Sequence, residues 1–253
     1  MFYHNINPVL LKLGSLEIRY YGLMYVVGIA VCYLIVARYS KRLKLGITKQ
    51  QIQDILFWGV LGLLLGGRLG YCLFYNPGYF LSHPLDIVKI WEGGMSFHGG
   101  LLGALLLTWI YSKRHSLPFL KLADLFVLPV PIALAFGRLG NFINGELYGR
   151  PCNCWWGFYF PNAPDHGLVP RHPSQIYEML KNLFIFLVLW VLSNRKHKPG
   201  FLLFSFIFLY GLLRFIVEFL RAPEIVFMGV TMGQWLSIPM IVIGGAWILL
   251  RAR

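Results

Sequence analysis

A dense run of polar residues, GRLGNFINGELYGR, occupies positions 137–150 and directly follows the apolar stretch LADLFVLPVPIALAF. Arg138 and Asn141 are three residues apart, so they would share a face of a helix, and Asn144 would follow on that face if the helix continued. A guanidinium group binds a phosphate through two parallel hydrogen bonds. The residue types and their spacing therefore indicate a binding site for a phosphate-bearing anion at the end of an apolar helix.

This polar run lies in a chain that is too apolar to be a soluble domain. Of its 253 residues, 57% are hydrophobic, whereas soluble domains average about 45–50%. Apolar runs of about 18 residues or more are candidate transmembrane helices. The sequence predicts an all-α integral membrane protein, a single transmembrane domain over 1–253, with seven spans at about 20–37, 53–75, 95–112, 122–142, 175–193, 200–220 and 233–250.

The basic residues between the predicted spans give the expected orientation. A cleaved signal peptide carries its basic residues before the apolar core, but here the first basic cluster follows the first span. Cytoplasmic loops are rich in Lys and Arg, so we expect the N-terminus and a loop over 145–172 outside and the C-terminus in the cytoplasm. The inner segments would carry Arg38, Lys41, Arg42, Lys44, Lys49, Lys113, Arg114, Lys121, Arg195, Lys196, Lys198, Arg251 and Arg253. The outer segments would carry Lys12, Arg19, Lys89, Arg150, Arg171 and Arg221. The net charge of +13 is then explained by topology and by attraction to anionic lipid, without nucleic-acid binding.

The polar residues inside the predicted spans lie in one half of the membrane. A charge at the bilayer centre costs about 3 kcal/mol, so such residues usually face the bundle interior and indicate function. With the expected orientation they fall in the outer half, which predicts a polar chamber in the outer-leaflet half. These residues are Tyr21, Arg68, His98, Arg138, His172, Gln175, Glu178, Arg214, Glu218 and Gln234.

Several segments, in order along nearly the whole chain, resemble one enzyme family. They are RYYGLMYVVG (19–28), GGRLGYCLFYNP (66–77), HGG (98–100), GRLGNFINGELYG (137–149), RHPSQIYE (171–178), YGLLRFIVEFLR (210–221) and MGQWLSIPM (232–240). Together they strongly resemble the prolipoprotein diacylglyceryl transferases, and the 137–149 stretch looks like the diagnostic signature of that family.

The resemblance implies a reaction in a bacterial cytoplasmic (inner) membrane. The family transfers an sn-1,2-diacylglyceryl group from phosphatidylglycerol to the lipobox cysteine of a preprolipoprotein signal peptide. A thioether forms and glycerol 1-phosphate leaves, which is the first step of lipoprotein maturation. The implied partners are phosphatidylglycerol, the lipobox peptide and the bilayer, and no metal or cofactor is expected.

The resemblance and the chemistry together suggest roles for single residues. Arg138 and Arg214 are expected to stabilise the departing phosphate, and His98 is the candidate general base, since an imidazole titrates near neutral pH. Asn141, Asn144 and Glu146 are expected to hold the glycerol hydroxyls of the headgroup. Tyr21 and Gly149 match functionally important family residues, the glycine through its backbone geometry. Secondary candidates are Arg68, Glu218, Arg221 and Gln234.

Several of these residues also have a purely structural interpretation. Arg68 would bond helix-end carbonyls, Glu178 and Lys181 would pair along one helix, and Glu218 would pair with Arg214 or Arg221. Arg138 and His98 also have this interpretation, as a structural arginine and an interfacial histidine. Gln175 and Gln234 would form hydrogen bonds at helix starts.

The cysteines carry little of the predicted function, because the reacting thiol belongs to the substrate. Cys152 and Cys154 form a C-x-C in the 145–172 loop. A disulfide across one residue closes a strained ring, and two thiols alone make a poor metal site, so the sequence assigns this pair no role. Cys32 and Cys72 lie in predicted spans.

Two other classes of function compete with the enzyme. Embedded arginines also line anion transporters, but the polar residues stop in the outer half and no inverted repeat is visible. A non-catalytic lipid-binding protein would not need so rich a set of His, Arg, Asn and Glu side chains.

Overall fold

The computed structural model describes residues 1–14, 16–42, 46–222 and 226–251. Lys44 and Arg253, two of the basic residues used for the orientation, lie outside the described residues. By its contacts the chain divides into two compact units, Met1–Val36 with Ala123–Arg253 and, separately, Ala37–Leu122. The single domain expected over 1–253 stays a prediction.

Helices form at each of the seven predicted spans. They are α1 (Tyr20–Arg42), α2 (Lys49–Phe74), α4 (Phe97–Arg114), the pair α5 (Phe119–Val127) and α6 (Val130–Ile143), α7 (Ser174–Ser193), α8 (Phe201–Glu218) and α9 (Met232–Arg251). Five of them, α1, α2, α7, α8 and α9, are long and apolar enough to cross a membrane, or six spans if α5 and α6 count as one. The chain is therefore a helical, multi-pass membrane protein, while the count of seven stays a prediction.

Shorter elements lie before and between these helices. The helix α3 spans Pro77–Ser82, and two 3-10 helices, η1 and η2, span Pro84–Val88 and Ile90–Glu92. Among the described residues, three small sheets pair β1 (Phe2–Tyr3) with β4 (Phe158–Tyr159), β2 (Val9–Leu13) with β3 (Leu16–Arg19), and β5 (Val226–Phe227) with β6 (Val230–Thr231). These strands were not predicted from the sequence, and several of them are too short to show a hydrophobic period.

The predicted fourth span is broken in the structure. Helices α5 and α6 meet at an angle of 41°, and Pro129 caps the start of α6, with Pro131 in its first turn. Proline lacks a backbone N–H and disfavours a helical conformation in the residue before it, so the sequence LPVPI ends one helix and starts another. The prediction of one continuous helix over 122–142 was therefore wrong at this point.

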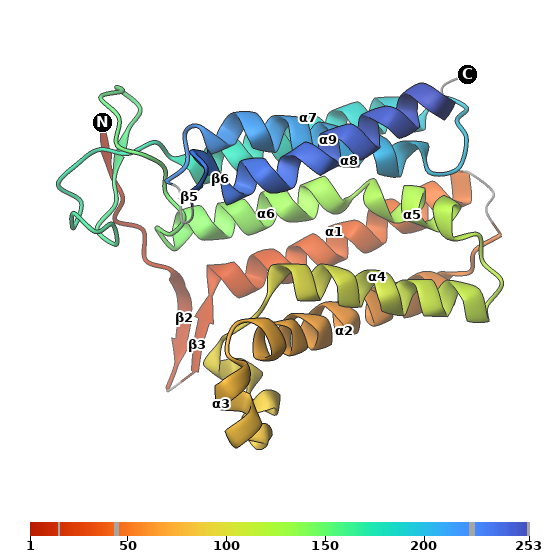
Figure 1. The fold of residues 1–253 in the computed structure, drawn as a ribbon, viewed down its shortest axis with the longest axis horizontal. Coiled ribbons are helices and arrows are strands. Elements are labelled where there is room, and N and C mark those ends of the chain that lie inside the picture. Colours follow the sequence, from red (N-terminus) through yellow and green to blue (C-terminus); the bar gives the residue numbers. More distant parts are fainter. Residues whose placement is uncertain (15, 43–45, 223–225, 252–253) are drawn as a thin grey trace. The chain divides into compact units, whose positions relative to one another are not determined.

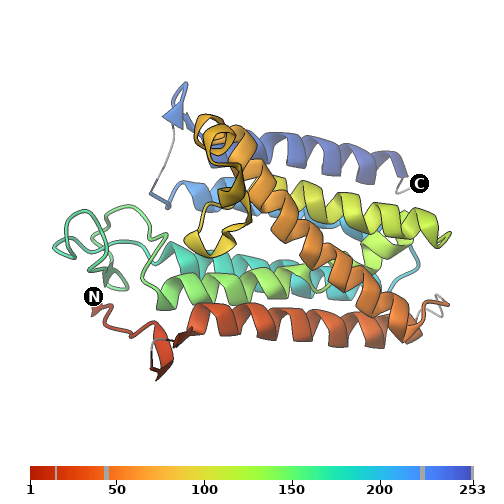
Figure 2. The same ribbon diagram turned by 90° about the horizontal axis from the view of Figure 1, so that it is seen from below.

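In the unit Ala37–Leu122, helices α2 and α4 cross in close contact through glycines (Figure 2). Gly62 and Gly66 of α2 face Gly99 and Gly103 of α4, and a Cβ at any of these positions would overlap the backbone of the other helix. Small residues four apart let membrane helices approach this closely.

In the other unit, α6 packs on α7, α7 on α8 and α8 on α9, and these helices lie side by side in Figure 1. Helix α7 turns its polar residues inward, since Glu178, Lys181 and Asn182 are buried, while Phe184 and Leu187 are more than half exposed. An apolar exterior around a polar interior is the arrangement expected of a helix that faces lipid.

Helix α8 receives an unusual cap from α5. The buried carboxylate of Asp124 accepts hydrogen bonds from the backbone N–H groups of Gly200 at 2.7 Å and Leu203 at 2.9 Å. A carboxylate at a helix N-terminus accepts hydrogen bonds from unpaired N–H groups and is attracted to the positive end of the helix dipole. This interaction fixes the start of α8 to α5.

Candidate active site

A buried carboxylate, Glu178 of α7, lies at the centre of the candidate site. Its Oε2 atom is 2.6 Å from Lys181 Nζ and 3.8 Å from Arg138 Nε of α6. Its Oε1 atom accepts a hydrogen bond from Arg214 Nη1 of α8 and lies 3.9 Å from Arg221 Nη1. Four cationic side chains therefore converge on one carboxylate that is inaccessible to solvent.

A second carboxylate, Glu218, completes what we call the Glu178 cluster: Arg138, Glu178, Lys181, Arg214, Glu218 and Arg221. Glu218 lies 2.8 Å from Arg214 Nη2 and 3.4 Å from Arg221 Nε. The spacing of four residues places Arg214 and Glu218 on one face of α8, and Arg221 follows the end of that helix. Thr231 also donates to Glu218, and Gly233 leaves room for the carboxylate, since a Cβ there would lie 2.6 Å from Glu218 Cδ.

The charges in this cluster do not balance. Two carboxylates face four cations, so the cluster carries an excess of two positive charges. Arg221 Nε and Nη1 are buried and have no hydrogen-bond acceptor among the described residues. Burial, followed by the neighbouring charges of Arg214 and Arg138, lowers the pKa of Arg221. Because guanidinium groups remain protonated, the cluster is suited to bind an anion.

The polar run of the signature stretch extends from Arg138 away from this cluster. Arg138 Nη1 donates to Asn141 Oδ1 at 3.5 Å, so the predicted shared face is confirmed. Asn141 and Asn144 donate to the same carboxylate oxygen, Glu146 Oε1, at 2.9 Å and 3.2 Å. The buried Oδ1 of Asn144 has no hydrogen-bond partner in the described part of the chain. These groups can exchange hydrogen bonds with a ligand's hydroxyl groups.

Gly149 allows two backbone segments to meet beside the cluster. Its N–H donates to the His172 carbonyl at 2.8 Å, and it pairs with Arg221 in an antiparallel bridge. A Cβ at Gly149 would overlap the carbonyl oxygen of Leu220. Arg150 then donates from Nε to the Arg221 carbonyl at 2.9 Å, so this glycine helps to position the segment that carries Arg221.

Tyr21 lies in the first turn of α1 and packs on the signature stretch. A Cβ on Gly140 would lie 2.8 Å from Tyr21 Cδ2, and the Tyr21 hydroxyl is 3.1 Å from that of Tyr25. Because Gly140 has no side chain, the half-buried ring of Tyr21 can lie against α6, the helix that carries Arg138 and Asn141.

Two predicted site residues belong to the other compact unit. Arg68 donates to the carbonyls of Ile87, Gly93, Gly94 and Asp86. This use of all its guanidinium nitrogens favours the structural interpretation over phosphate binding. His98 is exposed in the first turn of α4, and its approach to the arginines stays a prediction.

The glutamines act near helix starts, as their structural interpretation predicted. Gln234 Oε1 accepts from the Thr231 N–H at 3.1 Å at the beginning of α9, and Gln175 donates to the Glu146 carbonyl at 2.6 Å. The predicted pairing of Glu178 with Lys181 is present, but it describes only part of the role of Glu178. The sequence reasoning missed Glu178 as the meeting point of three helices, although its place in the RHPSQIYE segment was a usable signal.

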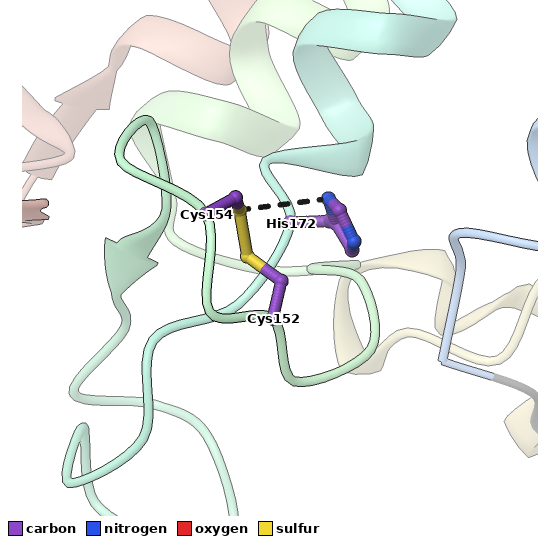
Figure 3. Close-up of side chains that lie close together, drawn as sticks. All are labelled: Cys152, Cys154 and His172. Carbon is purple, nitrogen blue, oxygen red and sulfur yellow. Dashed lines mark hydrogen bonds between the residues drawn. A yellow bond between two sulfur atoms is a disulfide. The ribbon is translucent and has the colours of Figure 1, made fainter.

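The argument against a disulfide in the C-x-C was wrong. Cys152 and Cys154 are joined by a disulfide, with a Cα–Cα distance of 5.4 Å that lies in the usual range. His172 Nδ1 lies 3.9 Å from Cys154 Sγ, so three potential metal ligands meet here (Figure 3). His172 was not predicted as a neighbour of the two cysteines because it lies far from them in the sequence. The pairing of residues 149–151 with 171–172 brings it close to them.

Comparison with known proteins shows the family of the chain. Residues 8–250 match the family model described as prolipoprotein diacylglyceryl transferase. A phosphatidylglycerol–prolipoprotein diacylglyceryl transferase of Bordetella avium is 46% identical, covering 98% of this chain and 95% of the relative. Relatives of the same name from Cupriavidus metallidurans and Coxiella burnetii are 44% and 46% identical, covering 98% and 97% of this chain and 94% and 95% of the relatives. The chain therefore belongs to the prolipoprotein diacylglyceryl transferase family.

Proposed function

We propose that the protein transfers the sn-1,2-diacylglyceryl group of phosphatidylglycerol to the lipobox cysteine thiol of a preprolipoprotein. The observation that carries this proposal is the Glu178 cluster, whose two excess positive charges match a phosphate group. The names of the relatives include phosphatidylglycerol and prolipoprotein.

The reaction forms a C–S bond and breaks a C–O bond. The substrate thiol gives its proton to His98, and the thiolate attacks the sn-3 carbon of the diacylated glycerol, which is linked to the phosphate through oxygen. The C–O electron pair leaves with glycerol 1-phosphate, on which negative charge builds. Arg138 and Arg214 donate hydrogen bonds to this phosphate, and preorganised donors of this kind stabilise such a transition state.

The other residues of the site hold substrate groups or hold the arginines. Asn141, Asn144 and Glu146 bind the hydroxyls of the glycerol headgroup, because their own hydrogen bonds form a short chain that begins at Arg138. Arg221, whose buried Nε and Nη1 atoms lack acceptors among the described residues, donates to the same phosphate as Arg138 and Arg214. Glu178 is a positioning residue, since it orients the arginines and touches no substrate atom in this scheme.

We also infer the arrangement of the chain in the bacterial cytoplasmic membrane. Seven spans place the N-terminus outside, the C-terminus in the cytoplasm and the Glu178 cluster in a polar chamber of the outer leaflet. Support comes from the helices found at each predicted span and from the basic residues of the inner segments. In this orientation an exported lipobox peptide and a lipid headgroup reach the same chamber.

The test is a transfer assay with the purified full-length protein in liposomes. It uses phosphatidylglycerol labelled in its acyl chains and a lipobox peptide with one cysteine. We expect label on the peptide thiol and release of glycerol 1-phosphate, and a peptide with serine in place of the cysteine provides the control. Binding of the lipid without transfer would make the chain a lipid-binding protein, and anion flux without transfer would make it a transporter.

A further inference from the structure

Three metal-ligating side chains, those of Cys152, Cys154 and His172, meet in the 145–172 loop (Figure 3). Their potential ligand atoms all lie within 4.8 Å of one another. The Cys154 Sγ atom is 3.9 Å from His172 Nδ1, and all three side chains are partly accessible. The transfer reaction proposed above uses none of these residues.

The backbone already holds these three residues in place. Cys152 donates its N–H to the Pro170 carbonyl at 2.9 Å, and His172 donates to the Arg150 carbonyl at 3.0 Å. The Cys154 carbonyl accepts from Gly157 at 3.0 Å, which closes a turn behind the second cysteine. A site whose backbone is ordered before binding loses less conformational entropy when a ligand arrives.

The donor atoms are those that zinc prefers. Zn²⁺ binds thiolate sulfur at about 2.3 Å and imidazole nitrogen at about 2.0–2.1 Å with tetrahedral geometry, which puts sulfur and nitrogen about 3.5 Å apart. The distance of 3.9 Å between Cys154 Sγ and His172 Nδ1 is close to this value. In the disulfide the two sulfurs are bonded to each other, so they become metal ligands after reduction and rotation of the cysteine side chains.

We propose that Cys152, Cys154 and His172 form a zinc site when the Cys152–Cys154 disulfide is reduced, and that the disulfide is the metal-free form of the same site. A dithiol reductant supplies two electrons and two protons to the S–S bond and closes its own disulfide. Zn²⁺ then displaces two thiol protons, forms two Zn–S bonds and one Zn–N bond, and takes water as its fourth ligand.

The hydroxyl of Tyr177 is the group that competes with the metal. It lies 3.0 Å from His172 Nδ1 and accepts a hydrogen bond from Trp156 Nε1 at 2.7 Å. Zinc binding at Nδ1 replaces the Tyr177 contact. Removal of this hydroxyl is therefore a change beside the ligand that should preserve binding.

The test uses the full-length protein in detergent. The disulfide is reduced with a dithiol, the reductant is removed without oxygen, and Zn²⁺ alone is titrated against a chromogenic chelator. We expect one zinc ion per reduced chain and none in the oxidised protein. Co²⁺ in place of Zn²⁺ should give sulfur-to-metal charge-transfer absorption in the reduced protein.

Variants then identify the ligands. Cys154→Ser should abolish zinc binding, and His172→Gln should weaken it about 10-fold or more. A Cys32→Ser and Cys72→Ser double variant and Tyr177→Phe are the controls, which should bind zinc as the wild type does. If a variant fails to fold, alkylation of the reduced wild type gives the same information, since zinc should protect Cys152 and Cys154 from the reagent. A reduced wild type that binds no zinc, or zinc binding that persists after loss of both loop cysteines, would overturn the proposal.

Discussion

At the scale of single residues, the site depends on two arginines that reach one carboxylate from different helices. Arg138 of α6 and Arg214 of α8 both contact Glu178. Lysine keeps the positive charge but lacks the planar guanidinium. An Arg→Lys substitution therefore tests the geometry of the side chain while its charge is kept.

We expect Arg138→Lys and Arg214→Lys each to lower kcat by about 10²–10³, the usual cost of removing one preorganised donor. The double variant should lose less than the product of the two effects, because both side chains serve one phosphate. The measurement is the transfer assay at saturating lipid, with Arg195→Lys in the exposed 194–199 loop as the control. Near wild-type turnover in the folded single variants would assign these arginines a structural role.

The carboxylate between the arginines should matter for stability. Glu178→Gln leaves buried cations without their counter-ion, and breaking a buried ion pair from one side costs about 3–5 kcal/mol. We expect a clear fall in the midpoint of thermal unfolding in detergent. Glu17→Gln removes a carboxylate from the exposed pairs with Lys12 and Arg19 and should cost less than about 1 kcal/mol. Equal midpoints for the two variants would contradict the central role of Glu178.

Much of this site could be predicted from residue types. An arginine or glutamate within an apolar span is expensive, so Arg138, Arg214 and Glu218 were identifiable without a structure. The convergence on Glu178 was not, because a pairing with Lys181 one turn away already satisfied that residue locally. Only the packing of α6, α7 and α8 brings the other cations to it.

At the scale of helices, α2 and α4 depend on the absence of side chains between them. Gly59 and Gly66 lie on the same helix but differ in their surroundings, because a Cβ on Gly66 would overlap the Gly99 carbonyl whereas one on Gly59 would make ordinary contact with Thr108 at 3.5 Å. These two glycines therefore offer a matched pair of substitutions.

Gly66→Ala should destabilise the protein by about 1–3 kcal/mol through overpacking. Gly59→Ala should be neutral or slightly stabilising, since alanine is the better helix former. Thermal unfolding of the two variants in the same detergent measures the difference. A Gly66→Ala protein as stable as Gly59→Ala would show that the two helices separate without cost.

The cysteines should be dispensable for the transfer reaction. A variant with Cys32, Cys72, Cys152 and Cys154 all changed to Ser is expected to keep its activity, because the reacting thiol belongs to the substrate. The transfer assay on the folded variant is the measurement. Complete loss of activity in a folded quadruple variant would point instead to a covalent enzyme intermediate or to a metal needed for catalysis.

The elements divide into those that the sequence predicts and those that it conceals. Long apolar runs predicted the helices because composition alone requires them in a membrane. The break at Pro129 was visible as LPVPI, yet an apolar run of sufficient length outweighed it in the prediction. The pairing of β1 with β4 joins residues about 156 positions apart, and two-residue strands have no period from which to predict such a contact.

At the scale of the whole molecule, the expected orientation can be tested directly. Single cysteines introduced at Asn5, at Asn162 in the 145–172 loop and at Arg253 are labelled from outside with a reagent that does not cross the membrane. We expect labelling at the first two positions and protection at the third, because the basic residues gather in the inner segments. Labels that place both ends of the chain on one side would exclude seven spans.

Helix α8 is attached at both ends, to α5 through Asp124 and to α7 through the contact of Arg214 with Glu178. A slide of one residue along its axis, about 1.5 Å with about 100° of rotation, would break both attachments at once. The two attachments therefore fix both the position of α8 along its axis and its rotation. A displacement of the loop at 194–199, which leads directly into the first turn of α8, would move the whole helix and Arg214 with it, without a local bend.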